Sequence, residues 1–417
     1  MVFVGDFHIH SRFSRACSKD ISVENLEKWA RIKGVDVLGT GDFTHAVWLK
    51  ELKDSLSDDG SGILRSKTGQ GFVLATEVSN IYTQEKGRRV HSVLLAPDFG
   101  VVDQINEELG NRGRLDYDGR PIFGFSCVEL VELMRSISKD IEVVPAHVWT
   151  PWFSVFGSKS GFDSVTDCFK DQAKHIHALE TGMSSDPLMN RRVSRNDRFQ
   201  MVSFSDSHSM WPWRLGREAT LFDGEESYAG LLKAIRTGEG LHSTIEVDPG
   251  YGKYHVDGHR ACGVVMLPEE TRKAKGICPV CKKALTIGVE YRVEELADRS
   301  VEEAEKHLTK PFLKLIPLHE LISGLYGKGL NTGFVWNIFN GLLKEFGSEL
   351  NVLLNASQEE LVRVCDEKMV DVILKNRRQE IEVRPGYDGV YGVPLLGRRV
   401  DEPVLQKGAQ KGLGEFF

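Results

Sequence analysis

The sequence predicts an α/β fold with further parts after it. Over the first 247 residues, short apolar runs that end in Gly or a polar residue alternate with helical patterns. This alternation is typical of a mainly parallel sheet with helices outside it. From about residue 248 the chain becomes Gly-rich and basic with three cysteines, and from about residue 300 helical patterns dominate. These changes predict domains at 1–247, 248–299 and 300–400, followed by a tail at 401–417.

Composition places the chain among soluble globular proteins. Its 417 residues are 41% hydrophobic and 27% charged, so nothing indicates wholesale disorder. No apolar run approaches the roughly 18 residues that span a membrane, and the N-terminal MVFVGDFHIH does not resemble a signal peptide. We therefore expect a cytoplasmic protein.

Cysteine usage and net charge narrow the class further. Seven cysteines in a chain of this length are too few for a disulfide scaffold, and the one close CxxC pair points to a metal. The formal net charge of −7 argues weakly against a nucleic-acid partner. Divalent cations bound to the N-terminal part would offset this acidity, so the net charge does not decide the question.

The first 247 residues predict repeated strand-then-helix units. Helical patterns over 23–33 and 126–138 lie between several of the short apolar runs. In a barrel of such units, the residues that follow the strands meet at one face and form the catalytic site. The expected strands are VDVLGTG (35–41), GFVLATE (71–77), SVLLAP (92–97), EVVPAH (142–147), HALETG (177–182) and MVSFSD (201–206).

Side chains that can bind metal fall at many of these strand ends. In DFHIH, His8 and His10 face the same side of a strand together with Asp6, because alternate residues share a side. An HxH pair alone is also compatible with two polar surface histidines. Asp206-x-His208 repeats the same spacing at another strand end. The other imidazole and carboxylate groups suited to zinc, manganese or iron are Asp42, Glu77, His91 and His147.

These motifs together resemble the polymerase and histidinol phosphatase (PHP) domain. The resemblance covers roughly residues 1–245 and implies a distorted (β/α)7 barrel with two or three divalent metals (Zn, Mg or Mn). Metals of this kind activate water and neutralise phosphoryl charge, which implies hydrolysis of phosphate esters without a Ser or Cys nucleophile. The matching segments are DFHIH, GTGDFTH, Glu77, His91, PAH (145–147) and SDSH (205–208).

The resemblance also implies a role for each matching residue. Glu77 would bridge two metals, the first surrounded by His8, His10 and Asp206 and the second held by His91 and His147. The catalytic set implied in this way is His8, His10, Glu77, His91, His147, Asp206 and His208.

A third metal would use His208 and the region of Asp42. The family often has Asp followed by His at this motif, whereas Phe43 follows Asp42 in this chain. We expect His45, two residues later, to take over the position of the missing histidine.

The Gly-rich segment after residue 248 predicts a structural zinc site. His259-x-x-Cys262 and Cys278-x-x-Cys281 are two ligand pairs separated by 15 residues, the pattern of a zinc knuckle. His255 is the alternative ligand if His259 faces away. The other cysteines have no such partners and are interpreted as core or surface thiols.

Nearly the whole chain resembles the endonuclease Q family. The resemblance implies a DNA repair endonuclease that cuts 5′ to deaminated bases (hypoxanthine, uracil, xanthine) and abasic sites, with the damaged nucleotide flipped out. In the matching segments, Trp149, Trp152 and Phe153 are candidates to stack on a base, and Arg191 or Arg192 is a candidate to hold a phosphate. The alternative for each of these residues is a structural role. The matching segments are GDFHIHSRFS, LGTGDFTH, PAHVWTP, ETGMSSDP, SDSHS with LGREA, GKYHVDGHRACG with CPVC, RVEELADR and PGYDGVYG.

The last eight residues, QKGLGEFF, fit a sliding-clamp-binding peptide. Gln410 would enter a polar pocket of a PCNA-type clamp, and Leu413, Phe416 and Phe417 would fill an apolar one after a tight helical turn. The alternative is that the two phenylalanines fold back onto the protein's own core.

Three function classes follow from these observations. A metal-dependent, lesion-specific DNA endonuclease accounts for the barrel, the zinc segment and the tail together. A phosphatase for a small phosphomonoester leaves the last two unexplained. A catalytically inactive DNA-binding adaptor conflicts with the full set of metal ligands.

Overall fold

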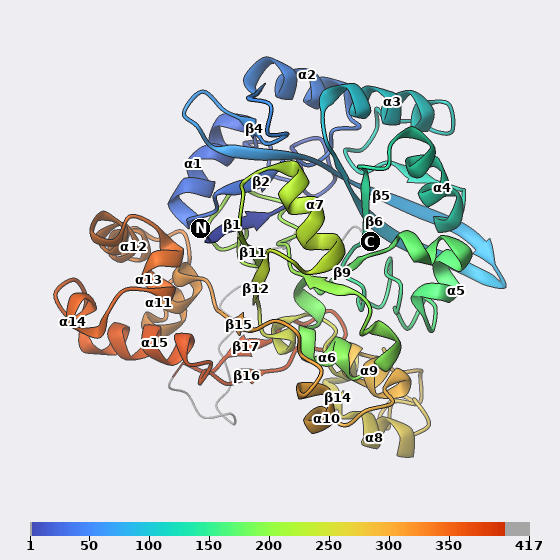
Figure 1. Ribbon diagram of the computed structural model, residues 1–417. Coiled ribbons are helices and arrows are strands. Elements are labelled where there is room, and N and C mark those ends of the chain that lie inside the picture. Colours follow the sequence, from blue (N-terminus) through green and yellow to red (C-terminus); the bar gives the residue numbers. More distant parts are fainter. Residues whose placement is uncertain (1, 397–417) are drawn as a thin grey trace.

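The computed structural model describes residues 2–396 (Figure 1). The clamp-binding peptide predicted at Gln410, Leu413, Phe416 and Phe417 lies outside these residues. Within the described part, no helix combines the length and the apolar character needed to cross a membrane.

A strongly curved sheet forms the wall of a barrel. Its strands, in order around the wall, are β1 (Val2–Asp6), β2 (Val37–Gly39), β5 (Gly71–Gln84), β6 (Lys86–Ala96), β8 (Glu142–Pro145), β9 (Ala178–Glu180) and β10 (Gln200–Val202). Just after β8, Val148 N donates to Glu180 O of β9 (3.1 Å), and a bridge between Ile9 and Ser207 closes the wall beside β1. This arrangement confirms the predicted α/β, barrel-like fold.

The sheet is mixed, which corrects the expectation of a mainly parallel one. β1, β2 and β5 are parallel neighbours, but β5 and β6 form one long antiparallel hairpin with Glu85 at its turn. The expected strand 71–77 continues to Gln84, because VSNIYTQ offers no Gly or Pro to end it. Glu77 therefore lies in the middle of a strand, not at its end.

Further strands widen the sheet, and helices cover its outer side (Figure 1). The added strands are β3 (Ser57–Asp58), β4 (Leu64–Arg65), β7 (Ile122–Phe123), β11 (Ala219–Asp223), β12 (Leu241–Glu246) and β15 (Phe312–Lys314). The helices of this part are α1 (Val23–Lys33), α2 (Ala46–Ser55), α3 (Phe99–Gly110), α4 (Cys127–Ile137), α5 (Val165–Phe169), α6 (Pro187–Arg191) and α7 (Tyr228–Thr237).

Two predicted helices match the structure closely because their ends are encoded locally. The side chain of Ser22 accepts from Asn25 N at the start of α1, and Gly34 ends that helix with a left-handed φ of 95°. Ser126 and Glu129 form a capping box at the start of α4.

β5 separates two layers of the core. Phe72 and Leu74 pack with the buried faces of the outer helices, whereas Val73 and Ala75 join a second cluster with Phe7. This alternation follows from the two-residue period of a strand. Both faces of β5 are therefore buried along this stretch, which fixes its register and the direction in which Glu77 points.

After the barrel come a small module and a helical region, at the lower right and lower left of Figure 1. The module contains β13 (Asp257–His259), β14 (Val264–Met266), α8 (Pro268–Lys273) and α9 (Val289–Leu296). α10 (Val301–Glu305) lies beside this module and packs against α6. The helical region contains α11 (Leu318–Tyr326), α12 (Gly333–Phe346), α13 (Glu349–Leu354), α14 (Gln358–Leu361) and α15 (Glu367–Arg377), followed in the chain by β16 (Val383–Arg384) and β17 (Val393–Pro394). Short 3₁₀ turns lie at Lys170–His175, Gly182–Ser184, Ser194–Asn196, Pro249–Tyr251 and Arg260–Cys262.

Both later parts are packed into the first one. Val289 and Val293 of α9 belong to the same buried cluster as the barrel's outer layer, and β15 pairs in parallel with β12. The predicted helical character after residue 300 is confirmed, and Ser357 and Glu360 form a capping box at the start of α14. The domain boundaries near 247 and 299 stay predictions, because the contacts cross both of them.

A buried ion pair joins the helical region to the barrel. Lys33 Nζ on α1 lies 2.7 Å from Glu349 Oε1 on α13, with both side chains at most 1% exposed. Lys33 Nζ also donates to Pro212 O at 2.8 Å. Pro212 belongs to the segment that follows Asp206 and His208, so the buried ion pair also helps to hold the segment that carries these two predicted metal ligands.

Candidate metal centre

Four of the predicted ligands converge at one end of the barrel. His8, His10, Glu77 and Asp206 each offer a ligand atom, and these atoms all lie within 4.8 Å of one another. His10 Nε2 is 3.1 Å from Asp206 Oδ1 and 3.3 Å from Glu77 Oε2. The described residues give the buried His8 Nε2 no hydrogen-bond partner. A buried polar atom of this kind requires a partner, and a metal ion at the centre of the group fits that requirement.

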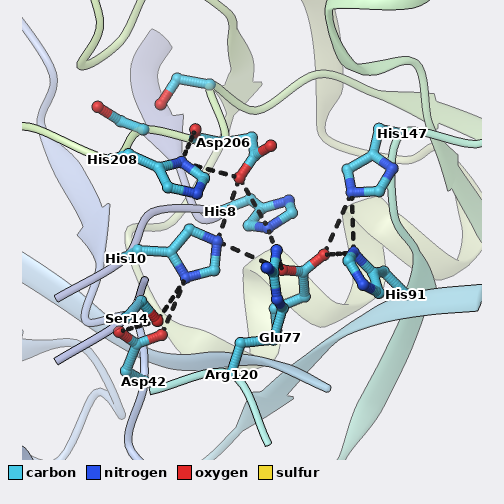
Figure 2. A network of polar contacts seen from close by, with 12 residues as sticks. His8, His10, Ser14, Asp42, Glu77, His91, Arg120, His147, Asp206 and His208 are labelled. Carbon is cyan, nitrogen blue, oxygen red and sulfur yellow. Dashed lines mark hydrogen bonds and ion pairs between the residues drawn. The ribbon is translucent and has the colours of Figure 1, made fainter. Parts of the chain in front are cut away.

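A second group shares Glu77 with the first. Glu77 Oε1 lies 2.7 Å from His91 Nδ1 and 3.2 Å from His147 Nε2, while Oε2 faces the first group. Figure 2 shows His91 and His147 on one side of Glu77 and the other ligands on the opposite side. A carboxylate that directs one oxygen to each of two ligand groups has the geometry of a bridging ligand.

Asp6, predicted on the same side as the two histidines, has another role. Its Oδ1 accepts from Ser205 N and its Oδ2 from Gly216 N, both at 2.9 Å. These bonds hold both ends of the segment that carries Asp206 and His208. Burial raises the pKa of Asp6 to about 6, although both backbone bonds oppose that rise.

Glu180 orients two ligands, and sequence reasoning missed it. Its Oε1 lies 2.8 Å from His8 Nδ1, and its Oε2 accepts from His147 N at 2.6 Å. Such a partner fixes the ring so that Nε2 faces the metal position. The sequence pattern could have indicated Glu180, because it lies near the end of the expected strand HALETG (177–182), as the other predicted acidic ligands do near theirs.

Asp42 and His45 lie outside both ligand groups of the described residues. Asp42 Oδ1 lies 3.0 Å from His10 Nδ1, and its Oδ2 accepts from Ser11 N, Ser11 Oγ and Ser14 Oγ. The His45 ring stacks on Phe13 with centroids 4.1 Å apart. Asp42 therefore orients His10 as Glu180 orients His8.

His208 lies at the edge of the first group. Its Nδ1 is 3.6 Å from Asp206 Oδ1, and its ring centroid is 4.5 Å from that of His10. The described residues do not bring it together with Asp42 and His45 into a third ligand group.

The backbone is strained at three site residues. Asp42, His147 and Asp206 have φ values of 45°, 31° and 46°, in the left-handed region that residues with a side chain seldom adopt. Such strain persists only where the surrounding structure enforces it, and it is concentrated at functional sites.

The charges around the site favour metal binding. Burial works to raise the pKa of Glu77, but its charged neighbours, Arg120 and His8 among them, outweigh burial and hold that pKa well below its usual range. Burial lowers the pKa of His91 to about 3 and that of His208 to about 4. At neutral pH Glu77 is therefore ionised, and His91 and His208 are neutral, which are the forms that bind a metal. The carboxylates around His8, His10 and His147 outweigh burial and raise the pKa of these three rings, so a bound metal would have to displace their protons.

The module after the barrel contains a third ligand group. His259, Cys262, Cys278 and Cys281 bring their ligand atoms within 4.8 Å of one another, with Cys281 Sγ 3.5 Å from His259 Nδ1. His255 instead points to Glu290, with 3.8 Å between Nε2 and Oε2. The geometry fits one tetrahedral zinc ion held by His259 and the three cysteines.

Several predicted DNA contacts are occupied by structural bonds. Trp149 is buried and donates from Nε1 to Asn190 Oδ1 at 2.8 Å. Arg191 is buried and donates to the carbonyls of Asn196 and Phe199. Trp152 and Phe153 are only half-buried, and Phe153 packs its ring 4.6 Å from that of His91.

The helical region matches a known protein family. Residues 317–380 match the family described as the MJ0043 C-terminal domain. The uncharacterized protein MJ0043 of Methanocaldococcus jannaschii is 33% identical over 252 residues, which are 59% of this chain and 31% of that protein. The chain thus spans about a third of that relative. The uncharacterized protein YqxK of Bacillus subtilis is 28% identical over 375 residues, 86% of this chain and 88% of its own length.

Solved structures extend the match to nearly the whole chain. The crystal structure of the lesion-specific endonuclease PfuEndoQ from Pyrococcus furiosus superposes with a TM-score of 0.85 at 31% identity, and the match covers 94% of this chain and 95% of that one. The chain belongs to the endonuclease Q family. Endonuclease Q in complex with a 27-mer duplex that has an abasic lesion at the active site matches equally well, with a TM-score of 0.85, 30% identity, and coverage of 99% and 100%.

Loss of the zinc group should affect this endonuclease Q fold beyond the module itself. Arg292 on α9 donates to the carbonyls of Phe156 and Phe162, so α9 holds the segment that contains Trp152 and Phe153. We expect Cys278→Ser to lose one zinc per chain and to expose 151–163 to protease, while the barrel metals remain. Metal analysis and limited proteolysis measure both effects. Cys365→Ser, which removes a thiol outside the zinc group, is the control, and an unchanged zinc content in Cys278→Ser would contradict the assignment.

Proposed function

We propose that this protein is a metal-dependent DNA repair endonuclease that hydrolyses the phosphodiester 5′ to deaminated bases (hypoxanthine, uracil, xanthine) and to abasic sites. The observation that carries the proposal is Glu77, whose two oxygens face separate ligand groups within a fold that matches endonuclease Q along its length. That fold includes the zinc module and the helical region, which a phosphatase for small phosphomonoesters would not need.

The proposed site consists of metal ligands and of carboxylates that orient those ligands. His8, His10, Glu77 and Asp206 would hold one divalent metal, and Glu77, His91 and His147 a second. Such metals supply an activated water and neutralise charge on the phosphoryl oxygens. Glu180 and Asp42 hold the rings of His8 and His10 at fixed angles, so the ligand atoms need little rearrangement when the substrate arrives.

Lesion selection would begin with extrusion of the damaged nucleotide. A base that pairs poorly costs less to unstack than a normal one, which favours lesions before any contact reads them. Phe153 is half-buried and packs on His91 of the second ligand group, and the half-buried Trp152 precedes it in the chain. We propose that they stack on the extruded nucleotide or fill the gap it leaves.

We also retain the proposal that Gln410, Leu413, Phe416 and Phe417 bind a PCNA-type sliding clamp. It rests on the match of QKGLGEFF to a clamp-binding peptide. A binding measurement between the full chain and a clamp, compared with a Phe416→Ala/Phe417→Ala variant, tests it: equal affinity for both would reject the proposal.

Cleavage of a defined duplex tests the main proposal. An end-labelled duplex with one deoxyinosine or deoxyuridine, incubated with magnesium or manganese, should give a single nick immediately 5′ of the lesion. Undamaged duplex should stay intact. Asp206→Ala should abolish the nick, because it removes a ligand of the first group. Asp54→Ala, which removes an exposed carboxylate from α2, should cleave normally.

The other outcomes separate the alternatives. Intact DNA with every metal, together with turnover of a small phosphomonoester, would favour a phosphatase. Lesion binding without cleavage of either substrate would favour an adaptor.

A further inference from the structure

Arg120 lies at the centre of the candidate site although no motif points to it. β7 pairs in parallel with β5, with Ser79 opposite Ile122. Glu77 lies two residues before Ser79, and Arg120 lies two residues before Ile122, so this register brings Arg120 beside Glu77. Arg120 Nη1 donates to Glu77 Oε2 at 3.1 Å, and the side chain is 14% exposed (Figure 2).

The loop of residues 118–121 is held firmly in this position. Arg120 N donates to Asp118 Oδ1, and Gly119 N donates to Phe13 O, both at 3.2 Å. Thr44 Oγ1 donates to Gly119 O at 3.1 Å. Phe13 and Thr44 belong to two other segments of the chain, so the backbone that carries Arg120 has little freedom to move.

The same loop covers Asp42. A Cβ atom on Gly119 would overlap Asp42 Oδ2 and Ser14 Oγ, so only a glycine fits against this carboxylate. Asp42 is fully buried, and both of its oxygens have protein partners. Within the described residues, protein groups therefore fill the place where the sequence suggested a third metal, and Arg120 follows Gly119 directly in the chain.

The guanidinium has unused hydrogen-bonding capacity. Burial works to lower the pKa of Arg120, but Glu77 and Asp206 outweigh it and keep the group charged. An arginine side chain has five N–H donors, and within residues 2–396 the bond to Glu77 is the one seen for this side chain. The remaining donors match the geometry of phosphate oxygens, for which arginine is well suited.

We propose that Arg120 is a catalytic residue that binds a non-bridging oxygen of the scissile phosphate and supplies the positive charge expected from a third metal. This inference rests on the proposed endonuclease function. During hydrolysis the water oxygen bonds to phosphorus, the bond from phosphorus to the leaving oxygen breaks, and one water proton goes to that oxygen. Arg120 gives and takes no proton. Its charge stabilises the phosphoryl oxygens as negative charge develops on them.

The alternative is that Arg120 only neutralises Glu77. In that case the loss of Arg120 would release the barrel metals, and the preference of the protein for a charged scissile phosphate would not depend on this side chain. The two roles therefore differ in metal content, in sensitivity to the charge of the scissile phosphate, and in rescue by a free guanidinium ion.

Arg120→Ala should keep both barrel metals by mass spectrometry and lower kcat for the lesion duplex by about 10²- to 10³-fold, the usual effect of losing one preorganised donor. Guanidinium chloride should restore part of the lost rate of Arg120→Ala. The kcat of Arg120→Lys should lie between that of wild type and that of Arg120→Ala. Arg114→Ala, from an exposed arginine in the same connection between α3 and β7, should behave as wild type.

A binding measurement tests the phosphate contact without turnover. A lesion duplex with a methylphosphonate at the scissile position lacks the charged oxygen. Wild type should bind it more weakly than the normal duplex, and this preference should be clearly smaller in Arg120→Ala, in which only the barrel metals still interact with the charged oxygen. An unchanged kcat, loss of the barrel metals without guanidinium rescue, or a wild-type preference for the charged phosphate in Arg120→Ala would each overturn the inference. Failure of wild type to nick the duplex would instead reject the proposed function.

Discussion

Glu77→Gln is expected to remove metal from both barrel groups and to abolish lesion cleavage. Glu77 faces His8 and His10 with one oxygen and His91 and His147 with the other. Glutamine keeps the shape but offers one neutral carbonyl oxygen, so it cannot serve both groups. We expect kcat to fall by more than the roughly 10³-fold upper range for loss of one preorganised donor.

The accompanying change in metal content makes the prediction specific. Glu77→Gln should lose metal from the barrel while it keeps the zinc of His259, Cys262, Cys278 and Cys281. Metal analysis per chain and the nicking assay give both results. Glu108→Gln removes an exposed carboxylate from α3 and should leave both unchanged. Normal nicking by Glu77→Gln with its barrel metals retained would contradict the bridging role of Glu77.

Lys33→Met is expected to destabilise the protein by about 3–5 kcal/mol, the usual result of breaking a buried ion pair. The change leaves the Glu349 carboxylate fully buried with Leu318 N as its remaining donor at Oε1. It also removes the donor to Pro212 O, in the segment after Asp206 and His208. Nicking activity should therefore decline at temperatures below the unfolding transition.

A double-mutant cycle identifies the buried charge as the cause. Lys33→Met/Glu349→Leu should recover much of the loss, because replacing both members of a buried pair by apolar groups is often near neutral. Lys50→Met breaks an exposed pair with Asp54 and should change stability by less than about 1 kcal/mol. Urea denaturation of wild type, Lys33→Met, Glu349→Leu, the double variant and Lys50→Met measures these differences. A Lys33→Met protein as stable as wild type would refute the prediction.

Local patterns carried much of the prediction. The alternation in DFHIH and SDSH, the paired His and Cys residues of the module, and the capped helices of α1 and α4 depend on residues within a few positions of one another. Their geometry is set by the period of a strand or helix, so it can be read before the fold is known. The α/β class and the helical C-terminal region follow from the same kind of signal.

The sequence by itself therefore determined the ligand types, the fold class and the zinc pattern. Tertiary structure decided which groups meet. It placed Glu77 within a long hairpin between two ligand groups, and set Glu180 behind His8, 172 positions away in the chain. It also placed Gly119 against Asp42 and Arg120 beside Glu77. The physical reason is that these contacts depend on strand register and loop packing, which join segments distant in the chain and leave no local period to read.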